Sequence, residues 1–447
     1  MPDHLLEQGP ERKPERKPER EPEREPEREP EREREREPER EREREPERGT
    51  ERGGLRRLPF RRANVLDPPA EFAALRAEGP VRQVRTLSGA TAWAVTGHDA
   101  AYRLFADPRL GRSYPGPDPD RAPRVSASPF AGRPYGDPVT ERERHLRMRQ
   151  VLAPSFSTRR VRLLAGRADA LVDGLLEAMA ARTPPGDLHQ LVSEPLPVLM
   201  MCELFGVPYE DRDRFRAWSG AYARFDAPEV ARAAQRELFS YVRELVEQRR
   251  DRPADDVISD LAALEGLPEA EIVQLTMLLM FAGHDTAVTR IDYGALLLLR
   301  HPEQYAALGA DPSLVPGAVE EMLRMSVPSD HGLVRYAHAD IETDGVTIRT
   351  GDAVLIFHGV ANRDPAAFPD PDRFDITRVR ESARPSLAFG YATHFCVGAQ
   401  LARAQLGSVF GRLARRFPAL RPAVPLSELR ATANTVTGGL TALPVTW

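Results

Sequence analysis

The sequence predicts a mainly α-helical protein with small β-sheets, and three observations support this prediction. Apolar residues recur at the spacing of an amphipathic helix through most of residues 141–299. Short strand-like segments occur before and after this region, within residues 81–95 and 340–358. Apolar positions return to helical spacing after residue 396, which predicts a last long helix.

A low-complexity segment opens the chain, and we assign it to residues 1–54. KPER, EPER and ER units repeat from Glu11 to Arg52, with proline recurring among them. Proline removes backbone donors and clashes with the preceding helical turn, and the repeats contain no apolar side chain to bury. We therefore expect a disordered tail followed by a single folded domain over residues 55–447. A dispensable extension is the favoured interpretation of this tail, and an interaction segment is the alternative.

The elements of the domain are expected in the following order. A helix over Ala70–Glu78 precedes strand-like segments at Val81–Leu87 and Thr91–Val95. The Pro/Gly-rich stretch Ser113–Asp137 has no periodicity, and a connection of that length is typically a lid or a binding loop. The helical region is followed by strands at Asp340–Ile348 and Ala353–His358 and by a Pro/Asp-rich meander at Arg363–Arg378.

Composition excludes several classes of partner. The 447 residues include 68 acidic and 63 basic ones, and this acidic excess lies within residues 1–52, so the folded part is neutral. Such a balance argues against nucleic-acid binding. Two cysteines, Cys202 and Cys396, cannot form a disulfide framework and indicate a reducing compartment. Without 18 consecutive apolar residues or a signal peptide, the chain is expected to be soluble, cytoplasmic, free of membrane and monomeric.

The strongest local signal is the segment Phe389–Gly398, FGYATHFCVG, which ends where the last helix begins. Unpaired backbone N–H groups and the positive end of the helix dipole favour a thiolate at Cys396. A thiolate bound axially to haem pushes electron density onto the iron and promotes cleavage of the O–O bond. A buried, inert cysteine is the alternative, and the flanking glycines and His394 argue against it.

This segment resembles the cysteine signature of the cytochrome P-450 superfamily, F-G-x-G-x-H-x-C-x-G. Phe389, Gly390, His394 and Gly398 match it, and the resemblance assigns Cys396 to the haem iron. Ala392 replaces the second glycine, a change that adds strain to the loop or alters the hydrogen bonding of the sulfur. The resemblance extends from Leu58 to the C-terminus and is closest to the soluble bacterial branch. It implies the P-450 fold, with haem b between the helix of Thr286 and the cysteine loop.

Two further motifs agree with this resemblance. Glu321 and Arg324 lie three residues apart on one helical face and resemble the buried pair of the family. By the same resemblance, Arg373 of the segment PDRF completes a structural triad that holds the cysteine loop.

The segment Phe281–Ala287, FAGHDTA, is expected within a long helix. The Thr286 hydroxyl can bond back to the Ala282 carbonyl and bend the helix, and Gly283 adds room there. Reduction of dioxygen needs protons at such an opening. The resemblance assigns Thr286 to positioning the proton donor and Asp285 to relaying protons from solvent, and it places Ala282 and Gly283 against the haem.

The haem propionates and the electron supply imply further residues. His145 and Arg149 are four apart on a helix, and the resemblance makes them propionate partners together with Arg335 and His394. No G-x-G-x-x-G motif follows a strand, so electrons from NAD(P)H must arrive through external partners, expected to be a ferredoxin and its reductase. Three neighbouring arginines form either a docking patch for that acidic donor or a solvated face: Arg142, Arg144 and Arg147.

The expected activity is hydroxylation or epoxidation of a lipophilic small molecule with dioxygen, as in secondary metabolism. By helix spacing and resemblance, Leu278, Phe281, Ala282 and His331 should line a mostly apolar pocket. The polar segment Ser329–His331 favours a polyketide, terpenoid or peptide-like substrate with oxygen functions. Oxidative coupling or dehydrogenation by the same haem is one alternative, and a catalytically silent recruitment domain of the same fold is another.

Overall fold

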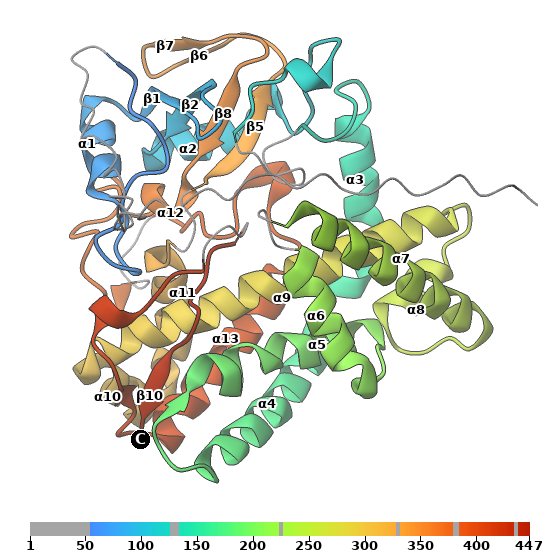
Figure 1. The fold of residues 1–447 in the computed structure, drawn as a ribbon, viewed down its shortest axis with the longest axis vertical. Helices are drawn as coiled ribbons and strands as arrows, with labels where there is room; N and C mark the ends of the chain where they lie inside the picture. Colours follow the sequence, from blue (N-terminus) through green and yellow to red (C-terminus); the bar gives the residue numbers. More distant parts are fainter. Residues whose placement is uncertain (1–53, 126–133, 223–226, 328–330, 379–383, 433–436) are drawn as a thin grey trace, which may run out of the picture. The chain divides into compact units, whose positions relative to one another are not determined.

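A five-stranded sheet occupies one end of the fold, and long helices make up most of the rest (Figure 1). The computed structural model describes residues 54–125, 134–222, 227–327, 331–378, 384–432 and 437–447. All of them belong to one unit, Arg52–Trp447. Residues 1–53, which include nearly all of the expected tail, lie outside the described part.

The helices dominate, as the hydrophobic periodicity predicts. In chain order they are α1 Ala70–Glu78, α2 His98–Ala106, α3 Glu141–Leu152, α4 Thr158–Ala180, α5 Pro195–Phe205, α6 Arg212–Tyr222, α7 Pro228–Asp251, α8 Val257–Ala262, α9 Glu269–Leu299, α10 Pro302–Ala310, α11 Val315–Met325, α12 His358–Ala361 and α13 Ala399–Arg416.

The main sheet has the order β1-β2-β8-β5-β3. Its strands are β1 Val81–Arg85, β2 Thr91–Val95, β3 Leu110–Gly111, β5 Leu333–Ala337 and β8 Ala353–Ile356. The central strand β8 is buried along its whole length, which explains its uninterrupted apolar sequence AVLI. It runs parallel to β2 and antiparallel to β5, and the latter pairing carries Arg335 opposite Val354.

Two smaller sheets complete the strands. The expected strand Asp340–Ile348 is a hairpin of β6 Ile341–Thr343 and β7 Val346–Ile348. Asp344 and Gly345 turn it with positive φ angles of 48° and 75°, as a two-residue Asp-Gly turn requires. The third sheet joins β4 Gly186–Asp187, β10 Pro444–Thr446 and β9 Arg421–Pro422.

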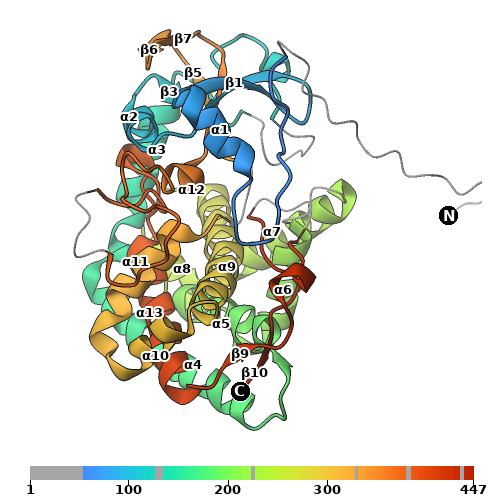
Figure 2. The ribbon, with the colours of Figure 1, turned by 90° about the vertical axis from the view of Figure 1, so that its left-hand side faces the viewer.

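Helix α9 runs through the centre of the helical part, with α5 and α13 near it (Figure 2). Residues 291–299 of α9 are buried without exception. By length and composition α9 is long and apolar enough to cross a membrane, and half of its most apolar window is buried inside the fold. Core helices of globular proteins meet the same criteria, so this finding indicates a central core helix.

The mainly α fold with small sheets is confirmed. Helix α1 has the predicted bounds, whereas β1 ends at Arg85, two residues earlier than expected. Within Ser113–Asp137, the described residues contain one short 3-10 turn, Pro119–Arg121, and residues 126–133 lie outside the described part. Between residues 363 and 377 the meander consists of turns and irregular chain, without a helix or strand.

Candidate active site

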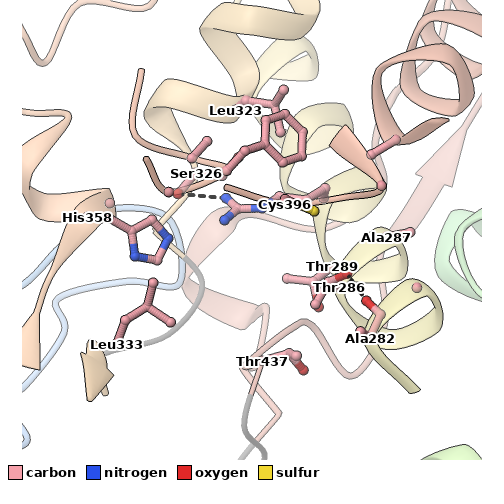
Figure 3. Close-up of a pocket in the computed structure, with 18 of the residues that line it drawn as sticks. Ala282, Thr286, Ala287, Thr289, Leu323, Ser326, Leu333, His358, Cys396 and Thr437 are labelled. Carbon is pink, nitrogen blue, oxygen red and sulfur yellow. Dashed lines mark hydrogen bonds between the residues drawn. The ribbon is translucent and has the colours of Figure 1, made fainter. Parts of the chain in front are cut away.

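A cavity of about 500 Å³ is lined by α9, by the loop that precedes α13 and by β5 (Figure 3). Cys396 reaches it from the loop, whereas Ala282 and Thr286 reach it from α9. Most of the lining side chains are apolar, including Leu279 and Leu333. An apolar cavity with a few polar groups is the usual form of a small-molecule site.

The loop before α13 is held by its own backbone hydrogen bonds. The Cys396 N–H donates to the Phe389 carbonyl at 3.0 Å, and the Phe395 N–H donates to the Ala392 carbonyl at 3.0 Å. Gly390 has a φ of 70°, where a glycine is favoured. Ala392 has a φ of 56°, so the alanine at this position does adopt the strained left-handed conformation.

The Cys396 side chain lies within the fold. It is nevertheless accessible, because its thiol faces the cavity. Enclosure by the surrounding protein raises the pKa of the thiol, while the Gly398 N–H and Arg149 act to lower it. The start of the helix therefore lowers the pKa of the Cys396 thiol, as predicted, but burial raises this pKa by more. A thiolate here needs a further positive charge, such as that of a metal ion.

Helix α3 contacts this loop through the predicted pair of basic residues. The Arg149 guanidinium donates to the Phe395 carbonyl at 2.8 Å, and Nε2 of His145 lies 2.9 Å from the Thr393 carbonyl. The His145 and His394 rings are 4.1 Å apart between centroids. Neither His145 nor Arg149 is among the described residues that line the cavity. In this structure they hold the cysteine loop from outside.

Thr286 lies opposite this loop, and its hydroxyl donates to the Ala282 carbonyl at 2.7 Å. The predicted back-bond is present. Thr286, Ala282 and Gly283 all line the cavity (Figure 3). A Cβ at Gly283 would lie 3.0 Å from the Met201 side chain, so this glycine also permits α5 to approach α9. The neighbouring His284 turns elsewhere, with Nδ1 2.8 Å from the Ser219 hydroxyl.

Asp285 accepts a hydrogen bond from the Thr437 hydroxyl, which lies near the C-terminus of the chain. Burial raises the pKa of the Asp285 carboxyl, and the bond from Thr437 opposes this shift. Thr437 itself lines the cavity (Figure 3). The carboxyl group is thereby connected to the cavity through a hydroxyl.

The predicted triad needs one correction. Arg324 donates to Glu321 at 2.7 and 2.8 Å, as expected of a buried pair. The second arginine that donates to Glu321 is Arg378, at 3.1 Å, and not Arg373. The Arg373 side chain is 66% exposed and pairs with Asp375. Arg373 contributes its carbonyl, which accepts from Arg324 and Arg378, because the meander turns its side chain outward.

Comparisons with known proteins agree with this geometry. A sequence profile described as "Cytochrome P450" matches residues 117–427. The chain belongs to the cytochrome P450 family. It is 41% identical to pentalenolactone synthase of Streptomyces exfoliatus, over 88% of this chain and 99% of that protein. It is 38% identical to the cytochrome P450 monooxygenase PikC of Streptomyces venezuelae, over 85% and 91%.

A solved structure extends the match to three dimensions. The substrate-free P450 PimD, a polyene macrolide antibiotic pimaricin epoxidase, superposes with a TM-score of 0.80 at 38% identity, covering 88% of this chain and 99% of that one. This P450 is accordingly a haem monooxygenase.

The charges at the cavity fit a haem with its two propionates. Arg335 lines the cavity, and burial lowers the pKa of its guanidinium to about 10. Its guanidinium donates to the Val334 carbonyl at 2.8 Å, and within the described residues no carboxylate pairs with it. Burial, together with Arg335 and His145, lowers the pKa of His394 to about 3. Arg335, a buried cation without a carboxylate partner among the described residues, and the neutral His394 ring, which can donate one N–H, suit an anionic ligand.

The predicted substrate residues are only partly brought together. Ala282 and His331 line the cavity, whereas Leu278 and Phe281 are not among its described lining residues. Leu278 is 46% exposed. The reason is that Leu279, Gly283 and Thr286 define the side of α9 that faces the cavity, and at 3.6 residues per turn Leu278 and Phe281 lie outside this side of the helix.

Several polar lining residues escaped the sequence interpretation, among them Arg290, Thr437 and His358. Arg290 lies four residues after Thr286, and this spacing places it on the same helical face, so the sequence did contain a signal. Thr437 and His358 come from segments far along the chain, and no local pattern connects either of them to α9.

Proposed function

We propose that this P450 inserts one oxygen atom from dioxygen into a lipophilic secondary metabolite, by hydroxylation or epoxidation. The observation that supports it is the arrangement of the Cys396 thiol and the Thr286 hydroxyl on one apolar cavity. The relatives named above include a macrolide epoxidase and a pentalenolactone synthase. From these relatives we infer that the substrate is a terpenoid or a polyketide, comparable in size to the substrates of those enzymes.

Haem bound through Cys396 supplies the activation of dioxygen. Arg335 and His394 are the residues that would hold its propionates, with His145 and Arg149 securing the loop behind them. Phe389, Gly390 and Gly398 shape that loop and line the cavity.

Thr286 and Asp285 deliver protons in this proposal. The Thr286 hydroxyl is fixed by its bond to Ala282 and presents its oxygen to the cavity. Asp285 can hold a proton at Oδ1, since burial favours its neutral form while Oδ2 accepts the bond from the Thr437 hydroxyl. The Thr286 hydroxyl and the Asp285 carboxyl together form a short proton relay at the wall of the cavity.

Electrons reach the haem from NAD(P)H through a ferredoxin and its reductase in this proposal. The chain has no dinucleotide-binding motif, and Arg142, Arg144 and Arg147 are exposed on α3 beside the two residues that contact the cysteine loop. We further propose a cytoplasmic monomer, in agreement with the scarcity of cysteine.

The ferrous–CO spectrum of the purified protein tests the assignment of the thiolate. We expect the Soret band that is typical of a thiolate-bound haem. Cys396→Ala should lose this band, whereas Cys202→Ala, the matched control, should keep it. A silent or non-haem domain would lack the band in the wild type, and a band retained by Cys396→Ala would contradict the ligand assignment.

A further inference from the structure

Arg290 and His358 are two cationic or potentially cationic side chains in an otherwise mainly apolar cavity wall. Arg290 lies on α9, one turn beyond Thr286, and His358 is the first residue of α12. His358 and Ser326 lie on one side of the pocket, whereas Ala282 and Thr286 lie on another (Figure 3). The assigned roles of haem binding and proton delivery use neither Arg290 nor His358.

Arg290 lacks an anionic partner within the described residues. Its guanidinium donates to the Ser326 carbonyl at 2.9 Å, and no ion pair involves it. A guanidinium has five N–H donors, so most of them remain available to a bound molecule. Ser326 caps the C-terminal end of α11, and the negative end of that helix dipole compensates only part of a full charge.

His358 also lacks a hydrogen-bond partner for one of its ring nitrogens. Its Nδ1 atom is buried and has no hydrogen-bond partner of acceptable geometry in the described chain. Burial and the nearby Arg290 lower the pKa of the imidazole to about 4. Burial also lowers the pKa of the Arg290 guanidinium to about 10. Backbone carbonyls of Ser326 and Ile356 act on the two side chains, but no carboxylate of the described residues does, so a buried anion would stabilise both groups by supplying the missing negative charge.

The haem propionates do not account for this pair. Arg335 and His394 form a separate basic group, whose electrostatic neighbours are Arg112, His145 and Glu141 rather than Arg290 or His358. Arg290 also belongs to α9, the helix of Thr286, whereas Cys396 lies on the loop before α13. The two residues therefore line the cavity from different elements. Arg290 is one turn from the hydroxyl that serves the reaction, so it lies within reach of a molecule held there.

We propose that Arg290, assisted by His358, binds a carboxylate of the substrate and so selects acidic lipophiles for oxidation beside Thr286. This inference rests on the proposed function, since it names the substrate class of the same site. The guanidinium offers the paired donors that a carboxylate accepts, and the apolar remainder of the cavity encloses the hydrocarbon skeleton. The buried charge also orients the substrate, because the carboxylate can bind at one end of the cavity only.

Binding of matched acids and esters tests this proposal in the ferric holoenzyme. Dodecanoic, adamantane-1-carboxylic and abietic acids, each with its methyl ester, are titrated at pH 7.5 and followed by the Soret band and by equilibrium dialysis. At least one acid should bind about tenfold or more tightly than its ester. Esters are the more hydrophobic molecules, so an apolar cavity without a cation would give the opposite order. An ester preference in every pair would overturn the proposal.

Variants of Arg290 identify the residue responsible. Arg290→Gln can still donate to the Ser326 carbonyl but has no charge, and it should abolish the preference for the acid. Arg290→Lys keeps the charge and should retain part of the preference. Arg300→Gln removes an exposed charge at the end of the same helix and should behave as the wild type. If Arg290→Gln does not fold, Arg290→Lys and His358→Gln provide the test, each with a reduced preference expected.

The remaining outcomes separate this proposal from its rivals. Loss of haem from Arg290→Gln would mean that Arg290 serves a propionate, and the proposal would be wrong. If Arg290→Gln has a lower melting temperature but an unchanged preference for the acid, Arg290 only stabilises the C-terminal end of α11, and the proposal would be wrong. A wild type without the thiolate-type CO band would refute the proposed function itself, whereas a normal band with no acid preference refutes only this inference.

Discussion

Ala392 carries a methyl group in a left-handed backbone conformation, within the loop that presents Cys396. An L-residue in this region is destabilised by about 1–2 kcal/mol relative to the usual conformation. Glycine avoids that strain but has more freedom in the unfolded chain, so the net gain is smaller.

We therefore expect Ala392→Gly to stabilise the haem-loaded protein by about 1 kcal/mol. Thermal unfolding of the holoprotein measures the effect. Ala388→Gly is the control in the same loop, since Ala388 has no positive φ, and it should destabilise the protein. A melting temperature that falls in Ala392→Gly would show that the loop does not store strain at this position.

We propose that the Thr286 hydroxyl contributes to proton delivery rather than to binding. Thr286→Ala removes the bond to Ala282 and leaves an otherwise similar cavity wall. Haem content and substrate affinity should persist, while product formed per NAD(P)H falls about tenfold and hydrogen peroxide is released instead. Thr286→Ser, which keeps the hydroxyl, should recover most of the coupling. Equal coupling in Thr286→Ala and the wild type would assign this work to another hydroxyl.

At the scale of elements, Glu321 connects α11 to the meander that follows α12. Arg324 and Arg378 meet its carboxylate in a buried site, whereas Arg373 points to solvent. Removing one partner of a buried pair leaves an unpaired charge, which typically destabilises a protein by about 3–5 kcal/mol.

Arg378→Gln should accordingly lower the free energy of unfolding by roughly that amount and reduce haem retention. Arg373→Gln serves as the matched control and should change stability by at most about 1 kcal/mol. Denaturant unfolding and the haem content of the purified variants measure both. The reverse order of effects would restore Arg373 as the second arginine of the triad.

Helix α3 carries two sets of basic residues that differ in their surroundings. His145 and Arg149 contact the cysteine loop, whereas Arg142, Arg144 and Arg147 are exposed. An acidic electron donor that docks beside this helix would be attracted over long range, and salt would screen that attraction.

Reversal of two charges, Arg144→Glu with Arg147→Glu, should slow ferredoxin-supported reduction by about tenfold or more at low salt. The difference should shrink as ionic strength rises, and peroxide-driven turnover should hardly change. The same reversal at Arg236 and Arg243, two exposed residues of α7, is the control. Equal losses in both assays would indicate damage to haem binding instead.

At the scale of the whole molecule, the described part of the chain begins at residue 54, and the repeats of residues 11–52 precede it in the sequence. Because those repeats have no apolar side chain to bury, their removal should not affect the core. Deletion of residues 1–52 is expected to leave the CO spectrum and the melting temperature unchanged, within about 1 °C. A clear loss of stability in the shortened protein would mean that the tail docks on the fold.

The sequence alone determined the fold class of this protein, the position of the cysteine loop and the long helix that contains Thr286. These features depend on local patterns: helical spacing in α9, the FGYATHFCVG segment, and the four-residue reach from Thr286 to Ala282. Bounds such as Ala70–Glu78 followed from the same periodicity.

Only the tertiary structure decided which distant side chains meet. Arg378, and not Arg373, donates to Glu321, and the Thr437 hydroxyl donates to Asp285. Leu278 is not among the described residues that line the cavity. The tertiary structure also put His358 and Arg290 on one apolar cavity. The physical reason is that side-chain direction and burial depend on how elements pack, and sequence spacing constrains contacts only within one helix or strand.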